Sequence, residues 1–78
     1  MDRFEAMQIF VSVAEHHSFA AAARGQGTSP ARVTRAVAAL EAQLGARLLH
    51  RTTRAVRLTE AGAAYLGQAK RILSELQL

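Results

Sequence analysis

The sequence predicts a mainly α-helical domain that carries a small β-hairpin and continues into a long helix. Two helical segments joined by a glycine-containing turn occupy about residues 18–45. A segment in which apolar and polar residues alternate follows at about 47–58, and an amphipathic segment occupies 60–78. A period near 3.6 residues indicates helix, and a period of two indicates strand. We therefore expect one folded unit at 1–59, followed by a linker helix at 60–78.

The first helix is expected to begin after Asp2, which can cap it while Glu5 reaches back to complete a capping box. The helix should end near residues 15–17. Apolar residues at helical spacing are expected to face the core, namely Phe4, Met7, Val11 and Ala14, with Ile9, Phe10 and Val13 widening the stripe.

Two further helices are expected on either side of the glycine-containing turn. Ser18 can cap the second helix, whose run of four alanines favours helix until Gly25 and Gly27 end it. Thr28 or Ser29 can cap the third, which has a proline at its first position. Its apolar stripe is expected at Val33, Val37, Leu40 and Leu44.

A hairpin and a long helix complete the predicted order. Val56 and Leu58 alternate with Arg57, so we expect two short strands around an arginine-rich tip at 51–54. Thr59 can cap the last helix, which over about 19 residues would span roughly 28 Å. Helix, helix, turn, helix, hairpin and long helix is the order of a winged helix-turn-helix.

Composition argues against several classes of function. The chain of 78 residues has no Cys, which excludes disulfides and thiolate metal sites. No apolar run approaches the roughly 20 residues of a membrane helix and no signal peptide is evident, so we expect a cytoplasmic protein. His16 and His17 are adjacent and would point about 100° apart on a helix, so we expect no metal site. With no acid/base or nucleophile constellation, we expect neither an enzyme nor a cofactor.

The positive charge is concentrated in the middle of the chain. The net charge of +4 is by itself a weak indication of a partner. Residues 46–59, however, contain four arginines and no acid, and residues 21–45 carry a net +2, whereas residues 1–20 carry a net −2. This distribution indicates that the middle of the chain contacts a polyanion.

The start of the third helix and the hairpin have the composition of a DNA-contacting surface. Small residues let a helix approach the major groove, and arginines contact guanine or phosphate. The candidates on the third helix are Ser29, Pro30, Ala31, Arg32, Thr34 and Arg35. An arginine-rich tip suits a minor groove or the phosphate backbone, and the candidates there are His50, Arg51, Thr52, Thr53 and Arg54. The alternatives are a three-helix bundle with a solvated arginine face and a loop whose charge only maintains solubility.

The last helix has a broad apolar side that indicates a partner helix. The candidate dimerisation residues are Tyr65, Leu66, Ala69, Ile72, Leu73 and Leu76. The alternative is that the whole helix folds back on its own core. A helical protein-interaction module that dimerises without binding DNA is the rival function, although this surface offers almost no aromatic anchors.

Two motifs identify a family that the chain resembles. They are Arg-Leu-Leu-His-Arg-Thr-Thr-Arg at 47–54 and Leu-Thr-Glu-Ala-Gly at 58–62, preceded by Ser-Pro-Ala-Arg-Val-Thr-Arg at 29–35. With them the chain resembles the N-terminal DNA-binding domain of LysR-type transcriptional regulators. The resemblance implies a bacterial regulator that binds double-stranded DNA sequence-specifically, with the third helix in the major groove and the wing on the minor groove or backbone.

The same resemblance implies an assembly. Family members form a homodimer through the linker helix, read an interrupted inverted repeat and are commonly tetramers at full length. It also implies a C-terminal effector domain, which is absent from this chain. Three residues depart from the family pattern: Gln26 and Thr28 stand where apolar residues are usual, and Arg32 stands where a small residue is usual. Arg32 would add a positive side chain beside the groove.

Overall fold

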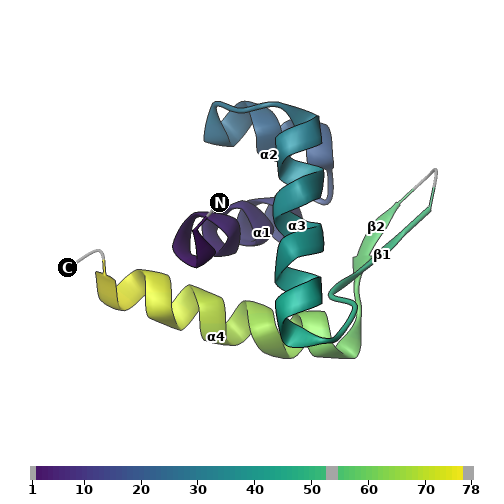
Figure 1. Cartoon of the computed structure of the whole chain (residues 1–78). Helices are drawn as coiled ribbons and strands as arrows, with labels where there is room; N and C mark the ends of the chain where they lie inside the picture. Colours follow the sequence, from purple (N-terminus) through teal and green to yellow (C-terminus); the bar gives the residue numbers. More distant parts are fainter. Residues whose placement is uncertain (1, 53–54, 77–78) are drawn as a thin grey trace.

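The described residues of the chain form four helices and one two-stranded hairpin, in the order predicted for a winged helix-turn-helix. A computed structural model describes residues 2–52 and 55–76 of the chain. The elements are α1 (Arg3–His16), α2 (Phe19–Gln26), α3 (Pro30–Leu44), β1 (Leu49–Arg51), β2 (Val56–Leu58) and α4 (Glu60–Leu76). In Figure 1, α3 stands between α2 and α4, and the hairpin projects to one side. The predicted fold class is confirmed.

Side-chain caps begin the first three helices at the expected places. The Oδ1 atom of Asp2 accepts from the Glu5 amide at 2.8 Å, and Ser18 Oγ accepts from the Ala21 amide at 3.1 Å. For α3 the cap is Ser29 rather than Thr28, because Ser29 Oγ accepts from the amide of the third helical residue at 3.2 Å. Pro30 occupies the first turn of α3, where its missing N–H costs no hydrogen bond.

Each of these three helices ends at a residue in the left-handed conformation. Gly27 has φ 68° after α2, and Gly45 has φ 66° after α3. A glycine takes this conformation without steric penalty, so the chain can turn sharply after each helix. The residue after α1 is His17, with φ 54°, whose amide donates to the Val13 carbonyl at 2.8 Å.

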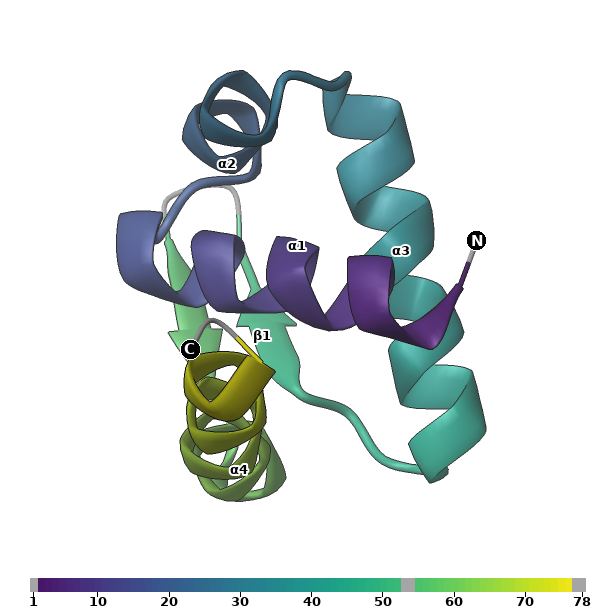
Figure 2. The ribbon, with the colours of Figure 1, turned by 90° about the vertical axis from the view of Figure 1, so that its left-hand side faces the viewer.

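The core lies around the middle of α1, which crosses α3 and the hairpin in Figure 2. Phe10 and Val13 are fully buried in α1, where they meet Val33 and Val37 of α3. Within the described residues, the main cluster of buried apolar side chains consists of Ala6, Ile9, Phe10, Val13, Ala22, Ala23, Val33, Ala36, Val37, Leu40, Leu48 and Leu49.

The predicted core stripes of α1 and α3 were partly wrong. Phe4 is 43% exposed and Val11 is only half-buried, because α1 packs against α2, α3 and α4 together and its buried face is centred on Phe10 and Val13 instead. Leu44 is 47% exposed, since it is the last residue of α3.

Leu48 joins the hairpin to the start of α4. The Thr59 amide donates to the Leu48 carbonyl at 3.0 Å, and the Thr59 hydroxyl donates to the Arg47 carbonyl. Thr59 Oγ1 also accepts from the Gly62 amide at 2.9 Å, which confirms Thr59 as the cap of α4. The hairpin is antiparallel, with Leu49 opposite Leu58.

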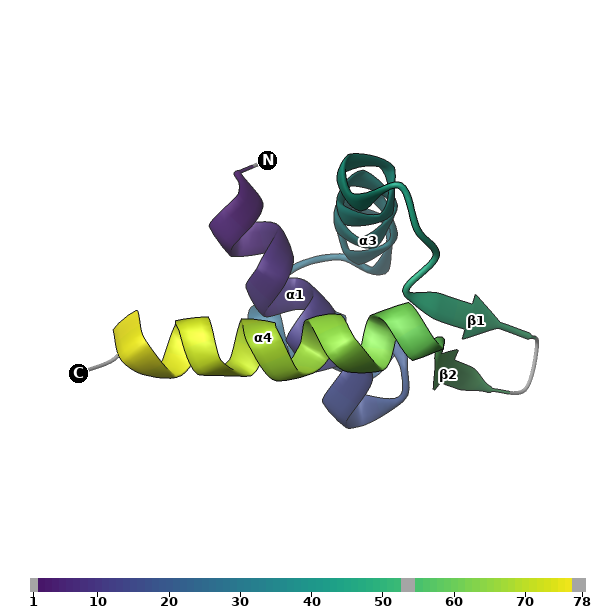
Figure 3. The ribbon, with the colours of Figure 1, turned by 90° about the horizontal axis from the view of Figure 1, so that it is seen from below.

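α4 covers the core from Gly62 to Ala69. The ring of Tyr65 lies 5.5 Å from the ring of Phe10, measured between centroids, and Ala69 is fully buried. At the start of α4, Ala61 is exposed and its neighbour Gly62 is buried. Figure 3 shows α4 running from the hairpin to the opposite end of the molecule. Within the described ranges, no helix is both long and apolar enough to cross a membrane.

Gly62 leaves no space for a side chain, so Gly62→Ala should destabilise the fold. A Cβ atom at this position would lie 2.0 Å from the Leu48 carbonyl oxygen, which is backbone and cannot move without displacing the hairpin. We expect a loss of about 2–3 kcal/mol in the free energy of unfolding, measured by urea titration with circular dichroism.

Gly67→Ala is the matched control. Nothing lies within 4 Å of a Cβ atom at this second glycine of α4, so the same substitution should stabilise the helix by about 0.5–1 kcal/mol. Equal effects of the two substitutions would contradict the tight packing of α4 against Leu48.

Candidate nucleic-acid interface

The outward side of α3 is a narrow strip with one charged side chain. Ala31, Arg35 and Ala38 are spaced four and three residues apart and are all exposed, whereas Val33 and Val37 on the inward side are fully buried. Residues at this spacing share one face of a helix. The two alanines leave room on both sides of the Arg35 guanidinium. Ala38 was not predicted as a site residue, although it lies seven residues after Ala31, a spacing that puts both on the same face of the helix.

Two predicted contacts lie on the flanks of this strip rather than on it. Thr34 is half-buried. Arg32 is turned toward α1, where its Nε donates to Glu5 Oε1 at 3.2 Å and a second guanidinium nitrogen donates to the same oxygen. One half of the expected capping box is formed, because Asp2 Oδ1 accepts from the Glu5 amide, and Oε1 of the Glu5 carboxylate contacts Arg32. The sequence predicted a positive side chain beside the groove at Arg32, and the structure pairs this side chain with the Glu5 carboxylate.

The beginning of α3 is open to a ligand. Ser29 and Pro30 are exposed, and Ser29 Oγ accepts a backbone hydrogen bond, which leaves its O–H able to donate outward. The first amides of a helix and its dipole attract anions such as phosphate.

Arg51 connects the hairpin to the helix-turn-helix. Its guanidinium carbon lies 4.5 Å from the centre of the Phe19 ring, at the first residue of α2. A cation above an aromatic face is attracted by the ring quadrupole. The contact therefore places the charge of Arg51 beside α2 and limits the positions that the side chain occupies.

The remaining described residues of the hairpin present polar groups. His50 lies opposite Arg57 in the strand register, and both are exposed. Arg57 was not among the predicted site residues, although its place between Val56 and Leu58 indicated that it points outward. Thr52 Oγ1 accepts from the Ala55 amide at 3.0 Å, which ties the two strands together. The predicted contacts Thr53 and Arg54 lie outside the described residues.

Glu41 positions the hairpin and was not predicted to do so. Its Oε2 atom accepts from the Leu48 amide at 2.8 Å and from the Leu49 amide at 3.3 Å, and it lies 3.6 Å from Nε of Arg47. The Glu41 side chain is only 14% exposed. Glu41 is the single acid among residues 21–59, and this is the feature of the sequence that could have indicated a special role for it.

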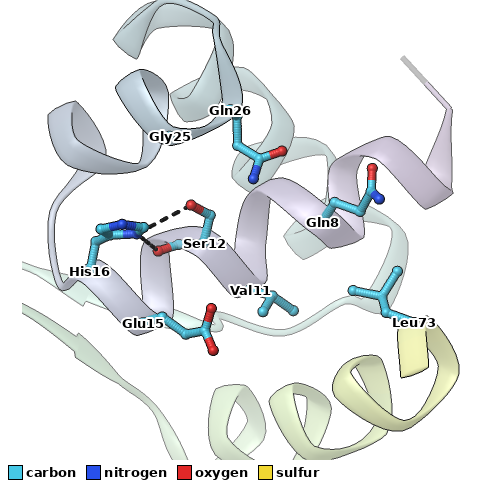
Figure 4. A pocket seen from close by; sticks show the side chains of 8 residues that line it. All are labelled: Gln8, Val11, Ser12, Glu15, His16, Gly25, Gln26 and Leu73. Atoms are coloured by element: carbon cyan, nitrogen blue, oxygen red, sulfur yellow. Dashed lines mark hydrogen bonds between the residues drawn. The ribbon is translucent and has the colours of Figure 1, made fainter. Parts of the chain in front are cut away.

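A hollow of about 240 Å³ lies away from α3, between α1, α2 and the far half of α4 (Figure 4). At one end, His16 Nδ1 lies 2.8 Å from the Ser12 carbonyl oxygen and 3.3 Å from Ser12 Oγ. Across residues 2–52 and 55–76, no three His, Cys, Asp or Glu side chains gather closely enough to hold a metal ion. The lining residues are Gln8, Val11, Ser12, Glu15, His16, Gly25, Gln26 and Leu73.

The predicted dimerisation residues divide into three groups by burial. Ala69 is fully buried against the chain's own core, so the prediction does not hold for this residue in the monomer. Tyr65, Leu66 and Leu73 are half-buried, and burial raises the pKa of the Tyr65 phenol above its ordinary value while the charge of Arg3 opposes the shift. Ile72 and Leu76 are 42% and 62% exposed, and they are the members of the set that a partner can reach.

An outward-facing helix after a tight turn, with a hairpin fixed beside it, defines a winged helix-turn-helix protein. Residues 4–63 match the family of bacterial regulatory helix-turn-helix proteins of the LysR type, and the chain belongs to this family. The predicted resemblance is confirmed.

Curated relatives support the same assignment. The chain is 55% identical over 69 residues to an HTH-type transcriptional regulator of Xanthomonas campestris, covering 88% of this chain and 20% of the relative. It is 49% identical over 76 residues to the uncharacterized HTH-type transcriptional regulator YhjC of Escherichia coli, covering 97% of this chain and 25% of the relative. The chain thus spans a quarter or less of the length of these two relatives.

Solved structures match the fold closely. The crystal structure of the CbnR DNA-binding domain in a DNA complex superposes with a TM-score of 0.92 at 43% identity, covering 99% of this chain and 87% of that one. The BenM DNA-binding domain in a complex with catB site 1 DNA also has a TM-score of 0.92, at 31% identity, covering 99% of this chain and 84% of that one.

Removing the Glu41 carboxylate should loosen the hairpin. In Glu41→Ala the amides of Leu48 and Leu49 lose their acceptor within a largely buried junction, and an unpaired buried amide costs about 1–3 kcal/mol. We expect a loss of this size in the free energy of unfolding, measured by urea titration.

Glu41→Gln separates the hydrogen bonds from the charge. Glutamine keeps an acceptor oxygen of nearly the same position, so it should lose distinctly less stability than alanine does. A Glu41→Ala chain as stable as the unmodified one would rule out this role of the carboxylate.

Proposed function

We propose that this chain is the sequence-specific, double-stranded DNA-binding part of a transcriptional regulator. The observation that carries the proposal is the outward strip of α3, in which Arg35 stands between Ala31 and Ala38 beside an arginine-bearing hairpin. The DNA complexes of CbnR and BenM domains, which share this fold, support it.

In this proposal α3 enters the major groove and the hairpin follows the adjacent minor groove or backbone. The alanines let the helix backbone approach the base edges, and Arg35 can donate two hydrogen bonds to one guanine. Ser29 and the open start of α3 suit a phosphate that fixes the register. Arg51, which lies beside α2 on the Phe19 ring, would contact the DNA backbone next to the groove that α3 enters.

We also propose that this chain catalyses no reaction and binds no cofactor. A regulator that acts through base and phosphate contacts needs no catalytic group and no cofactor within this chain, and it acts in the cytoplasm, where bacterial DNA is found. The hollow beside Ser12 and His16 has no part in this function.

We also propose a homodimer through α4, with a tetramer and an effector domain in the whole protein. Ile72 and Leu76 are four residues apart on one side of α4, and both are exposed near the end of the helix that is farther from the hairpin. Two such helices would cover each other's apolar side and set the spacing of two half-sites in an interrupted inverted repeat.

Arg35→Ala should reduce discrimination between DNA sequences. Using fluorescence anisotropy on a duplex selected from a random pool and on a scrambled duplex, we expect the difference in binding free energy to fall by about 1–3 kcal/mol, because one base contact is lost. For both duplexes, the logarithm of the affinity of the unmodified chain should fall linearly with the logarithm of the salt concentration.

Arg3→Ala is the matched control for charge. It removes the same charge near the other end of α3, where Arg3 Nε donates to Gln43 Oε1 at 3.3 Å, and it should leave discrimination unchanged. An equal loss on both duplexes for Arg35→Ala would show that Arg35 meets only phosphate, and no binding by the unmodified chain would refute the proposed function.

Ile72→Glu should weaken self-association. Pairing of two α4 helices would bring the two introduced carboxylates together on an apolar surface, where unpaired charge is costly. Sedimentation velocity should show a shift from dimer toward monomer. Ser74→Glu adds the same charge at an exposed residue on a different side of α4 and should leave the dimer intact; equal behaviour of both variants would contradict a dimer through this side.

A further inference from the structure

The contact between Arg32 and Glu5 stands at the edge of the α3 strip. The two residues lie on α3 and α1, 27 positions apart, so their contact is set by the tertiary fold. The Arg32 side chain is 43% exposed and that of Glu5 is 38% exposed. The guanidinium is therefore neutralised by a carboxylate while remaining at the surface.

Arg32 and Arg35 differ in whether a carboxylate neutralises their charge. They are three residues apart on α3, which makes them neighbours on the helix surface. Within the part of the chain that the structure describes, Arg35 has no ion pair, whereas both hydrogen-bonded nitrogens of Arg32 point to one oxygen of Glu5. The two adjacent cations are thus in different electrostatic states before any DNA arrives.

We propose that Glu5 is a positioning residue that keeps Arg32 from becoming a phosphate ligand. This inference rests on the proposed DNA-binding function. A phosphate contact by Arg32 would strengthen binding to every sequence alike, because the phosphate backbone is the same throughout. Glu5 occupies the guanidinium donors from the α1 side and so limits the sequence-independent part of the affinity.

Glu5→Gln removes the charge of the carboxylate while its backbone amide still caps α1 through Asp2. One additional phosphate contact should steepen the log–log salt dependence of binding to a random duplex by about 0.9, and at about 0.1 M salt it should raise that affinity by roughly fivefold. Circular dichroism melting curves confirm that each variant is folded.

A double-mutant cycle with Arg32→Ala tests whether Arg32 causes the steeper salt dependence of Glu5→Gln. In the unmodified background Arg32→Ala should leave the salt dependence unchanged, because Arg32 makes no phosphate contact there. In the Glu5→Gln background the same substitution should return the salt dependence to that of the unmodified chain. The proposal would be overturned if Arg32→Ala made the salt dependence of binding less steep by the same amount in both backgrounds.

Glu15→Gln is the control for net charge. It removes one negative charge from the other end of α1, where Glu15 lies 3.6 Å from the Lys70 ammonium, and it should leave the salt dependence unchanged. The same steepening by Glu15→Gln and Glu5→Gln would overturn the proposal in favour of a long-range charge effect. If the unmodified chain binds no duplex at any salt concentration, the proposed function itself fails. That result is distinct from one in which the chain binds DNA but the double-mutant cycle shows no coupling between Glu5 and Arg32.

Discussion

The hydrogen bonds around Leu48 fix the hairpin and α4 relative to α3, and the rest of the structure depends on them. The Leu48 amide donates to the carboxylate of Glu41 in α3, and its carbonyl accepts from Thr59 at the start of α4. Its side chain is buried in the core, and Gly62 packs against its carbonyl. Backbone polar groups in a buried junction require such partners. One residue therefore holds three elements in a single arrangement, and the hairpin cannot rotate independently of α3.

The charges on this rigid frame are also constrained before DNA is bound. Arg51 is stacked on Phe19 and Arg32 is neutralised by Glu5, while Arg35 projects between two alanines. Side chains that are already ordered lose less entropy on binding, which favours a defined register over diffuse attraction. Three arginines from the middle of the chain are thus in three different states: Arg35 is free, Arg51 is stacked and Arg32 is neutralised.

The local features of the fold could be read from the sequence because they depend on nearby residues. Caps at Asp2, Ser18 and Thr59 and the glycines after α2 and α3 are signals within one turn of the helix that they begin or end. The start of α3 was predicted as a site for the same reason, since small residues and two arginines occur together there.

Features that depend on packing between distant segments could not be read in this way. The turn of Arg32 toward Glu5, the role of Glu41 at the hairpin and the burial of Ala69 each require knowing which helix lies against which. The periodicity of α1 showed that it is amphipathic, but not that three neighbours would shift its buried face away from Phe4 and Val11. Side-chain pattern specifies an element, whereas its neighbours specify which of its polar groups remain free.

An NMR titration of the ¹⁵N-labelled chain with a selected duplex tests most directly whether α3 and the hairpin form one DNA-contacting surface. We expect the amide signals of Ala31, Arg35, Ala38 and His50 to shift together with one affinity, while those of Gln8 and Val11 beside the hollow stay in place. Shifts confined to α4 and the hollow, or different affinities for α3 and the hairpin, would contradict this expectation.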